Sequence, residues 1–442
     1  MTPFRKCLSL ALALLLQWSP TTALAWMVQS ELGYGLGIAM TPGGGVLTCG
    51  HSRGADGEYD FSIRLHRASD GTDVWHYRAD GTGGAAGGLT LDDAGDVIAA
   101  GTTDSGVSAD VRVVKLTTDG VPLWTTTIDS ATHEDDRFQA MAVGPGGDVA
   151  VTGTFSITYA VDHLYSVARL DGATGAVRWQ HDVPAAERSR GVTVGFDAAG
   201  DVLTTGALIA GSDSDVVALK LDGATGDELW RTVVVDGGYD GPSVSAIDAA
   251  GDFYVGVNAP ESTGEGFTVY KLSGTDGSVL WRFDHRARRD GTILALALDG
   301  SGHVYAAGFD YNQFVHERTV LAKLSAVSGV PVWSRRYPGM FFTTIGFDPS
   351  GDVILGGSNR TGLFAFQKVR ASDGRKRWRR KLPGDRYHGG SAQGVVTDAV
   401  GDVYVVGGDV GKIPPPHGGH YSYTVVKACG GNGRVGRTDT CR

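Results

Sequence analysis

The sequence predicts an all-β protein: an eight-bladed β-propeller of four-stranded antiparallel blades, with the ring closed by the N-terminal strand. A Gly-Asp-Val phrase recurs eight times at spacings of 49 to 53 residues, and a tryptophan recurs beside it in a second phrase. Glycine makes up 67 of 442 residues, about twice its usual share. A period of this length, with short apolar runs between turn signals, indicates one four-stranded sheet per repeat. A ring of seven blades is the alternative.

Residues 1–25 have the pattern of a secretory signal peptide. Arg5 and Lys6 precede an apolar run that is too short to span a bilayer, and Ala23-Leu24-Ala25 offers small residues where a signal peptidase reads. Cys7 precedes the apolar run, whereas a lipoprotein cysteine would follow it. We therefore expect an exported, soluble mature protein that is periplasmic or extracellular.

The first three strands of each repeat follow from its turn residues. Strand one, such as residues 294–299, ends in an Asp-x-x-Gly turn, in which the Asp side chain bonds backbone amides and Gly supplies a positive φ. Strand two is the Gly-Asp-Val phrase, and strand three alternates towards a basic residue. The basic column is Arg64, Lys115, Arg169, Lys220, Lys271, Lys323, Lys368 and Lys427.

Strand four begins in a Gly-x-x-x-Trp phrase, as in "LDGATGDELW", which ends at Trp230. The phrase follows strand three only seven times, because no Trp follows Lys427. Trp26 lies 49 residues ahead of Trp75, so the N-terminal segment is expected to supply the outer strand of the last blade. The docking column is Trp26, Trp75, Trp124, Trp179, Trp230, Trp281, Trp333 and Trp378.

The Gly-x-x-x-Trp phrase resembles the tryptophan-docking motif of the quinoprotein alcohol dehydrogenase-like propellers with PQQ-like repeats, which runs roughly Ala-x-Asp-x-x-Thr-Gly-x-x-x-Trp. Asp222, Thr225, Gly226 and Trp230 match that motif. The chain also resembles bacterial β-propeller repeat proteins of the SBBP type. The resemblance covers essentially all of the mature chain and implies that each Trp packs between neighbouring blades. It does not select a function, because the superfamily includes dehydrogenases and outer-membrane assembly scaffolds.

A dehydrogenase of that family would bind pyrroloquinoline quinone (PQQ), a planar tricarboxylate, together with Ca²⁺. This sequence has no adjacent cysteines for the disulfide lid of many members, and no mature Trp outside the docking column to form an aromatic floor, although Tyr or Phe could replace it. The usual hydrolase and nucleotide-binding motifs are absent. We expect no catalytic residue and no cofactor. A PQQ- or metal-dependent oxidoreductase is the alternative.

Function in a propeller is expected on loops that depart from the repeat. The loops from strand four to the next strand one, and from strand two to strand three, share one face and differ in every blade. His388 lies in the loop entering the last blade, and His417 and His420 lie in a long loop stiffened by prolines 414–416. These histidines are a candidate transition-metal site, although His-x-x-His on a loop is a weak signal and polar loop tips are the alternative.

Charge is segregated along the chain. Residues 26–284 contain 15 Lys and Arg against 37 Asp and Glu, whereas residues 285–442 contain 22 against 12. In a ring, sequence order becomes angular order, so one sector is acidic and the opposite one basic. The basic residues either protect an outer edge strand from pairing or dock an acidic partner or anionic envelope surface. This basic sector consists of Arg335, Arg336, Arg375, Lys376, Arg377, Arg379, Arg380 and Lys381.

Three cysteines remain after the signal peptide: Cys49, Cys429 and Cys441. Any single pair is possible in an exported protein, and pairing Cys429 with Cys441 is the most economical because it ties down the tail. The expected organisation is a signal peptide at 1–25, a propeller at 26–428 and a Gly-rich tail at 429–442. We expect a monomeric, non-enzymatic binding or scaffolding module for a protein or cell-surface component, with no nucleic-acid partner.

Overall fold

The computed structural model describes residues 25–104, 106–130, 133–157, 163–184, 187–211, 213–235, 242–258, 266–287, 290–311, 318–382, 390–409, 421–435 and 441. These residues are mostly in strands, with one short 3-10 helix, η1 (Pro145–Gly147). Among them, no helix is long and apolar enough to cross a membrane.

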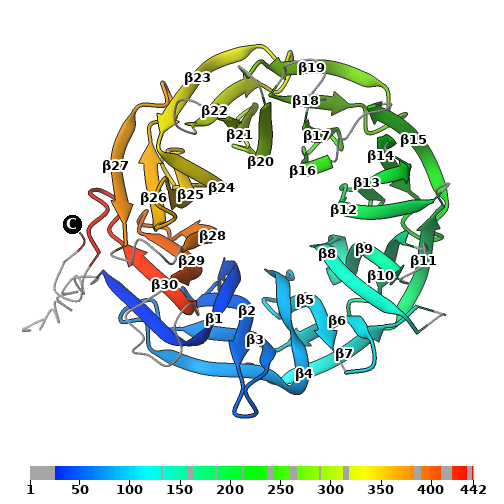
Figure 1. Ribbon diagram of the computed structural model, residues 1–442, viewed down its shortest axis with the longest axis horizontal. Helices are drawn as coiled ribbons and strands as arrows, with labels where there is room; N and C mark the ends of the chain where they lie inside the picture. Colours follow the sequence, from blue (N-terminus) through cyan, green and yellow to red (C-terminus); the bar gives the residue numbers. More distant parts are fainter. Residues whose placement is uncertain are drawn as a thin grey trace, which may run out of the picture.

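The strands form antiparallel sheets that stand radially around a common centre, so the chain is a β-propeller (Figure 1). Five of the sheets have four strands each. They are β8 (Asp135–Val143), β9 (Val149–Ile157), β10 (Leu164–Leu170) and β11 (Val177–Val183); β12 (Arg188–Phe196), β13 (Val202–Ala210), β14 (Asp213–Leu221) and β15 (Glu228–Val235); β16 (Pro242–Ile247), β17 (Phe253–Asn258), β18 (Phe267–Leu272) and β19 (Val279–His285); β20 (Asp290–Leu298), β21 (His303–Tyr311), β22 (Arg318–Ser325) and β23 (Pro331–Pro338); and β24 (Met340–Phe347), β25 (Val353–Asn359), β26 (Phe364–Val369) and β27 (Lys376–Lys381).

A sixth sheet has ten strands, because two long strands each pair with two successive groups. β1 pairs with β30 through residues 26–32 and with β2 through residues 33–40. β4 likewise pairs with β3 in its first half and with β5 in its second half. The strands in order are β28 (Ser391–Thr397), β29 (Val403–Asp409), β30 (Ser422–Ala428), β1 (Trp26–Met40), β2 (Val46–Arg53), β3 (Tyr59–His66), β4 (Asp73–Leu91), β5 (Val97–Asp104), β6 (Ala109–Leu116) and β7 (Pro122–Ile128).

The hydrophobic core lies between neighbouring sheets. The two middle strands of each sheet are largely buried on both faces, as in β18, where all six residues are buried, and they are therefore rich in apolar residues. The outer strands alternate between buried and exposed residues, as in β19. One core cluster joins Ile98 and Val113 from one sheet to Val151 and Ala168 from the next. Each sheet is therefore stabilised mainly by the sheets on either side.

The Asp-x-x-Gly turns have the bonds that the sequence predicts. Asp248 Oδ1 accepts hydrogen bonds from the backbone amides of Ala250 and Asp252, each at 3.0 Å, and Gly251 has a φ of 86°. A carboxylate that satisfies two amides and a glycine in the left-handed region together fix this tight turn.

The indole nitrogen of every tryptophan in the docking column donates to a backbone oxygen of the next repeat around the ring. Trp230 Nε1 donates to the backbone oxygen of Gly274 at 3.3 Å, and Trp179 Nε1 donates to that of Gly223 at 2.9 Å. The other six bonds run from Trp26 to Ala68, Trp75 to Thr118, Trp124 to Gly172, Trp281 to Ala326, Trp333 to Ala371 and Trp378 to Gly430.

Each ring also lies against a glycine of the next docking turn, which in all but one repeat is the glycine of a Gly-x-x-x-Trp phrase. A Cβ on Gly277 would lie 2.6 Å from the Trp230 ring, and Gly277 has a φ of 72°. The glycine is required both by its backbone conformation and by the close approach of the indole. We refer to this contact of ring, carbonyl and glycine as the tryptophan dock.

The basic column of strand three reinforces the docks. Lys220 Nζ donates to the same Gly274 oxygen at 3.1 Å and lies 2.8 Å from Asp197 Oδ2 and 3.2 Å from Asp201 Oδ2. Lys271, Lys427, Lys115 and Arg169 likewise bind the oxygen that the docking Trp of their own sheet uses. A buried cation is tolerated here because carboxylates and a carbonyl surround it.

Arg64 was predicted to belong to this column, and that prediction is wrong. Leu65, not Arg64, lies opposite Trp75 in the pairing of β3 with β4. The side-chain period of a strand is two, so this shift of one residue puts Arg64 on the other face of the sheet. There it bonds Asp73 Oδ2 at 2.8 Å and lies 5.5 Å from the centroid of the Tyr423 ring.

We predict that removing one dock weakens the propeller far more than removing a neighbouring side chain does. Trp230 is only 8% exposed, so Trp230→Ala should lower the free energy of unfolding by about 3–5 kcal/mol. Trp230→Phe keeps an aromatic ring and loses the bond to Gly274, so its loss should be smaller. Urea denaturation followed by circular dichroism measures the difference.

Leu229→Ala is the matched control, because Leu229 is adjacent and 51% exposed. Its effect should stay within about 0.5 kcal/mol. Equal losses in Trp230→Ala and Leu229→Ala would contradict a special role for the dock.

Candidate functional site

The two faces of the ring differ in what they carry. The Asp-x-x-Gly turns and the tryptophan docks lie at one end of the strands, which we call the dock face. The connections that differ between repeats lie at the opposite end, the loop face. His388, His417 and His420 lie outside the described residues, so the transition-metal site stays a prediction.

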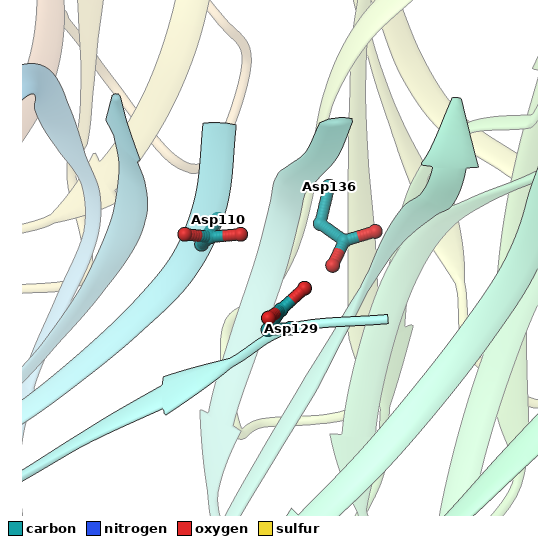
Figure 2. A group of neighbouring side chains, drawn as sticks. All are labelled: Asp110, Asp129 and Asp136. Atoms are coloured by element: carbon teal, nitrogen blue, oxygen red, sulfur yellow. The ribbon is translucent and has the colours of Figure 1, made fainter. Parts of the chain in front are cut away.

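Three carboxylates meet on the loop face between two neighbouring sheets. Asp110 is at the start of β6, Asp129 directly follows β7, and Asp136 is at the start of β8. One oxygen of each lies within 4.8 Å of the others, and the side chains converge from these three segments (Figure 2). We call Asp110, Asp129 and Asp136 the acidic cluster.

Hydrogen bonds hold the side chains of the acidic cluster in place. Asp136 is fully buried and accepts the amides of Ser130 at 2.6 Å and Ser156 at 2.7 Å. Asp129 Oδ2 lies 2.6 Å from His133 Nδ1. His133 and Ser156 are the residues other than glycine with a positive φ in the described part of the chain, at 54° and 60°. Such conformations gather at functional sites more often than elsewhere.

Asp110 and Asp136 differ electrostatically from the aspartates of the Asp-x-x-Gly turns. Burial raises the pKa of Asp110, and the charges of Asp129 and Asp135 raise it further. Burial also raises the pKa of Asp136. In the Asp-x-x-Gly turns, by contrast, the lysine column compensates the charge, as Lys220 does for Asp197. Carboxylate oxygens at this separation are the donors that a hard cation such as Ca²⁺ prefers.

The sequence analysis did not find the acidic cluster. The run His133-Glu134-Asp135-Asp136 was visible as a departure from the repeat. Asp110 comes from another strand at an ordinary-looking position, so only the packing of β6 beside β8 brings the carboxylates together.

Five of the inner strands line a central cavity of about 460 Å³. Its residues come from β1, β4, β8, β24 and β28, and every one of them is uncharged. Phe138 is the aromatic residue in this lining, and Gln139, Gln393 and Thr344 are among its polar groups. The described tryptophans all lie in the docks on outer strands.

PQQ does not fit the described lining. Its three carboxylates need basic partners, and burying them among neutral groups would cost several kcal/mol each. The inner strands contribute no Lys, Arg or carboxylate cage for Ca²⁺ to this cavity. We therefore derive no chemical step through a quinone.

The basic sector lies on the outer strands β23 and β27, which are consecutive on the perimeter (Figure 1). Several of its members have structural partners. Arg377 pairs with Asp352, Arg379 Nε donates to Gln367 Oε1 at 2.7 Å, and Arg380 Nε donates to the Gly433 oxygen at 2.7 Å. Reversing these charges would therefore damage the fold itself.

The remaining basic side chains are more exposed. Arg335 Nε donates to the backbone oxygen of Asp373 at 2.8 Å, and Arg375 Nε lies 3.5 Å from a carboxylate oxygen of the same residue. Arg336, Lys376 and Lys381 are all exposed. A test of docking on the basic sector must therefore change Lys376 and Lys381.

The cysteines differ in their surroundings. Cys429 and Cys441 form a disulfide with a Cα–Cα distance of 4.8 Å, and Cys49 is a free thiol buried in β2. Burial raises the pKa of Cys49 to about 12, so this thiol is inert at neutral pH.

We predict that Asp110→Asn stabilises the protein at pH 7 in the presence of EDTA. A raised folded-state pKa means that the folded state binds the proton more tightly than the unfolded state, so ionisation of Asp110 above that pKa costs stability. The gain should therefore disappear as the pH falls towards 3, below the unfolded pKa. The melting temperature measured across this range gives the answer.

Asp222→Asn is the control of opposite sign. Hydrogen bonds from the Thr225 and Ala224 amides lower the pKa of Asp222, so its loss should reduce the melting temperature at pH 7. A lower melting temperature for Asp110→Asn at pH 7 would contradict the electrostatic account of the cluster.

The comparisons with known proteins agree with the fold. Residues 59–257 and 265–415 match the family described as outer membrane protein assembly factor BamB. The solved structure of BamB from Moraxella catarrhalis is 15% identical, with a TM-score of 0.51, covering 92% of this chain and 99% of that one. No curated protein sequence matches the chain.

Quinohemoprotein alcohol dehydrogenases are similar in structure as well. The enzyme from Pseudomonas putida HK5 is 12% identical, with a TM-score of 0.60 and coverage of 94% of this chain and 77% of that one. The enzyme from Comamonas testosteroni is 13% identical, with a TM-score of 0.59 and coverage of 95% and 78%. Identities this low show the fold alone. The family match, in contrast, extends over most of the sequence, and the chain therefore belongs to the family described as outer membrane protein assembly factor BamB.

Proposed function

We propose that the chain is an eight-bladed propeller whose last blade is completed by its N-terminal strand. The ten-stranded sheet then counts as three blades that share β1 and β4, beside the five separate sheets. The pairing of Trp26 with Lys427 supports this, because it repeats the pairing of Trp230 with Lys220 inside a single sheet. The bond from Trp26 to Ala68 supports it further.

We propose that this propeller is an exported, non-enzymatic binding or scaffolding module. The observation that carries the proposal is the neutral central cavity, since a reaction centre there would need converging charged groups. The departures from the repeat, including the acidic cluster, lie instead on the loop face. Binding residues on loops that a rigid ring positions are the usual arrangement in propellers.

The family supports a partner in the cell envelope. Its description names a factor in outer membrane protein assembly, and residues 1–25 have the pattern of an export signal. We propose a protein or other envelope component as the partner, contacted by a monomeric protein in the periplasm or outside the cell. The basic sector is a second contact surface, suited to an acidic partner.

We predict that a partner cross-links to the loop face and not to the dock face. Val107, on the loop from β5 to β6, and Val327, on the turn from β22 to β23, are 92% and 87% exposed, so they form a matched pair on opposite faces. A photo-cross-linking residue at Val107 should trap an envelope protein in cells, whereas the same residue at Val327 should trap none. Mass spectrometry of the adducts identifies the product.

Loss of cross-linking at both positions, or equal yield at both, would contradict the loop-face proposal. The same strain with Lys376→Glu and Lys381→Glu tests the basic sector. At low salt we expect this double variant to give a several-fold lower cross-linking yield at Val107 than the wild type. At high salt the two yields should differ less, because exposed charges are screened. An unchanged yield at low salt would remove the basic sector from the proposal.

The alternative is a PQQ- or metal-dependent oxidoreductase. We expect no binding heat when the mature protein is titrated with PQQ, with or without Ca²⁺, because the described cavity lining offers no partner for the three carboxylates. Micromolar binding that depends on Ca²⁺ would overturn the non-enzymatic proposal.

A further inference from the structure

The turn at Cys429–Arg434 is a docking turn, although it lies in the segment that the sequence analysis assigned to a tail. The Gly433 amide donates to the Cys429 oxygen at 2.6 Å, and the Cys429 amide donates to the Arg434 oxygen at 3.0 Å. The same two bonds close the turn between Asp222 and Asp227. The predicted boundary at 428 therefore separates this turn from the ring that it serves.

This docking turn carries the contacts of a full dock with the neighbouring sheet. The Gly430 oxygen accepts Trp378 Nε1 at 2.9 Å and Lys368 Nζ at 3.2 Å. A Cβ on Gly433 would lie 2.6 Å from the Trp378 ring. Arg380 adds hydrogen bonds to the Gly433 and Asn432 oxygens at 2.7 and 2.6 Å.

The segment that follows the docking turn differs from the one that follows the other turns of this kind. After the turn at Asp222–Asp227 the chain continues directly into β15, which pairs with β14 and so anchors both ends of the turn. The residues after Arg434 cannot pair with β30 in the same way, because residues 26–32 of β1 already occupy that edge of β30. Among the described residues, the docking turn thus continues into a strand on one side only.

We propose that the disulfide between Cys429 and Cys441 replaces the missing strand and makes closure of this dock depend on oxidation. Cys429 is the first residue of the docking turn, and Cys441 lies beyond its free end. A bond between them closes a loop that contains the docking turn, which restricts the unfolded alternatives of the turn. The seam between β27 and the docking turn closes fully only after this bond forms.

The chemistry requires an external disulfide as oxidant. The thiolate of one cysteine attacks that disulfide and forms a mixed disulfide with release of one thiol, and the second cysteine then displaces the other thiol. Two protein thiols lose two electrons and two protons, and the oxidant becomes two thiols. Cys49 does not compete in the folded protein, because it is buried and protonated at neutral pH.

Amide hydrogen exchange of the mature protein, oxidised or treated with dithiothreitol, tests the proposal. Reduction should raise exchange about tenfold or more in residues 376–382 and 422–435. Exchange in residues 228–235, which carry the Trp230 dock, should change by less than about twofold. Cys441→Ser should reproduce the effect of reduction, and reoxidation with oxidised glutathione should reverse it only in the wild type.

Cys49→Ser is the control that leaves the disulfide intact, and its exchange should respond to reduction as the wild type does. Unchanged exchange around Trp378 after reduction would overturn the proposal. A uniform rise across all sheets would overturn it too, since the disulfide would then act on the whole fold. Should Cys441→Ser fail to fold, reduction of the folded wild type still decides between these outcomes.

Discussion

The structure depends on one repeated interaction, the tryptophan dock. An indole nitrogen and, at most docks, a strand-three cation bind the same carbonyl oxygen of the next sheet, as Trp230 and Lys220 do at Gly274. The cation is compensated by two aspartates that also shape the preceding turn. Turn, strand and neighbouring sheet are therefore coupled, and a change in one removes partners from the others.

This coupling requires each sheet to have a neighbour on both sides. The middle strands are buried on both faces, so a terminal sheet would expose an apolar surface and an unfilled dock. The two ends of the chain meet that requirement together. Residues 26–32 form the strand that pairs with β30. The turn at Cys429–Arg434 supplies the backbone oxygen that Trp378 binds.

The charged side chains of the dock face take part in structural contacts. Its aspartates and cations are used by one another, and the described lining of the central cavity is uncharged. The loop face is different: Asp110, Asp129 and Asp136 approach one another there without a lysine of the repeat among them. The departures from the repeat are therefore positioned by a rigid ring.

The sequence by itself determined the repeat, the β-propeller fold, the turn aspartates and the Trp column, because these depend on local spacing and on strand periodicity. It misplaced Arg64, since a shift of one residue in the pairing of β3 with β4 reverses the face on which a side chain lies.

Only the tertiary structure decided the acidic cluster and the docking role of Gly433. Asp110 and Asp136 meet through the packing of two sheets, and Gly433 meets Trp378 across a seam between two sheets. The acidic cluster leaves no periodic signal in the sequence because it forms at one pair of sheets only. The turn that contains Gly433 lacks the Trp that marks the other docking turns.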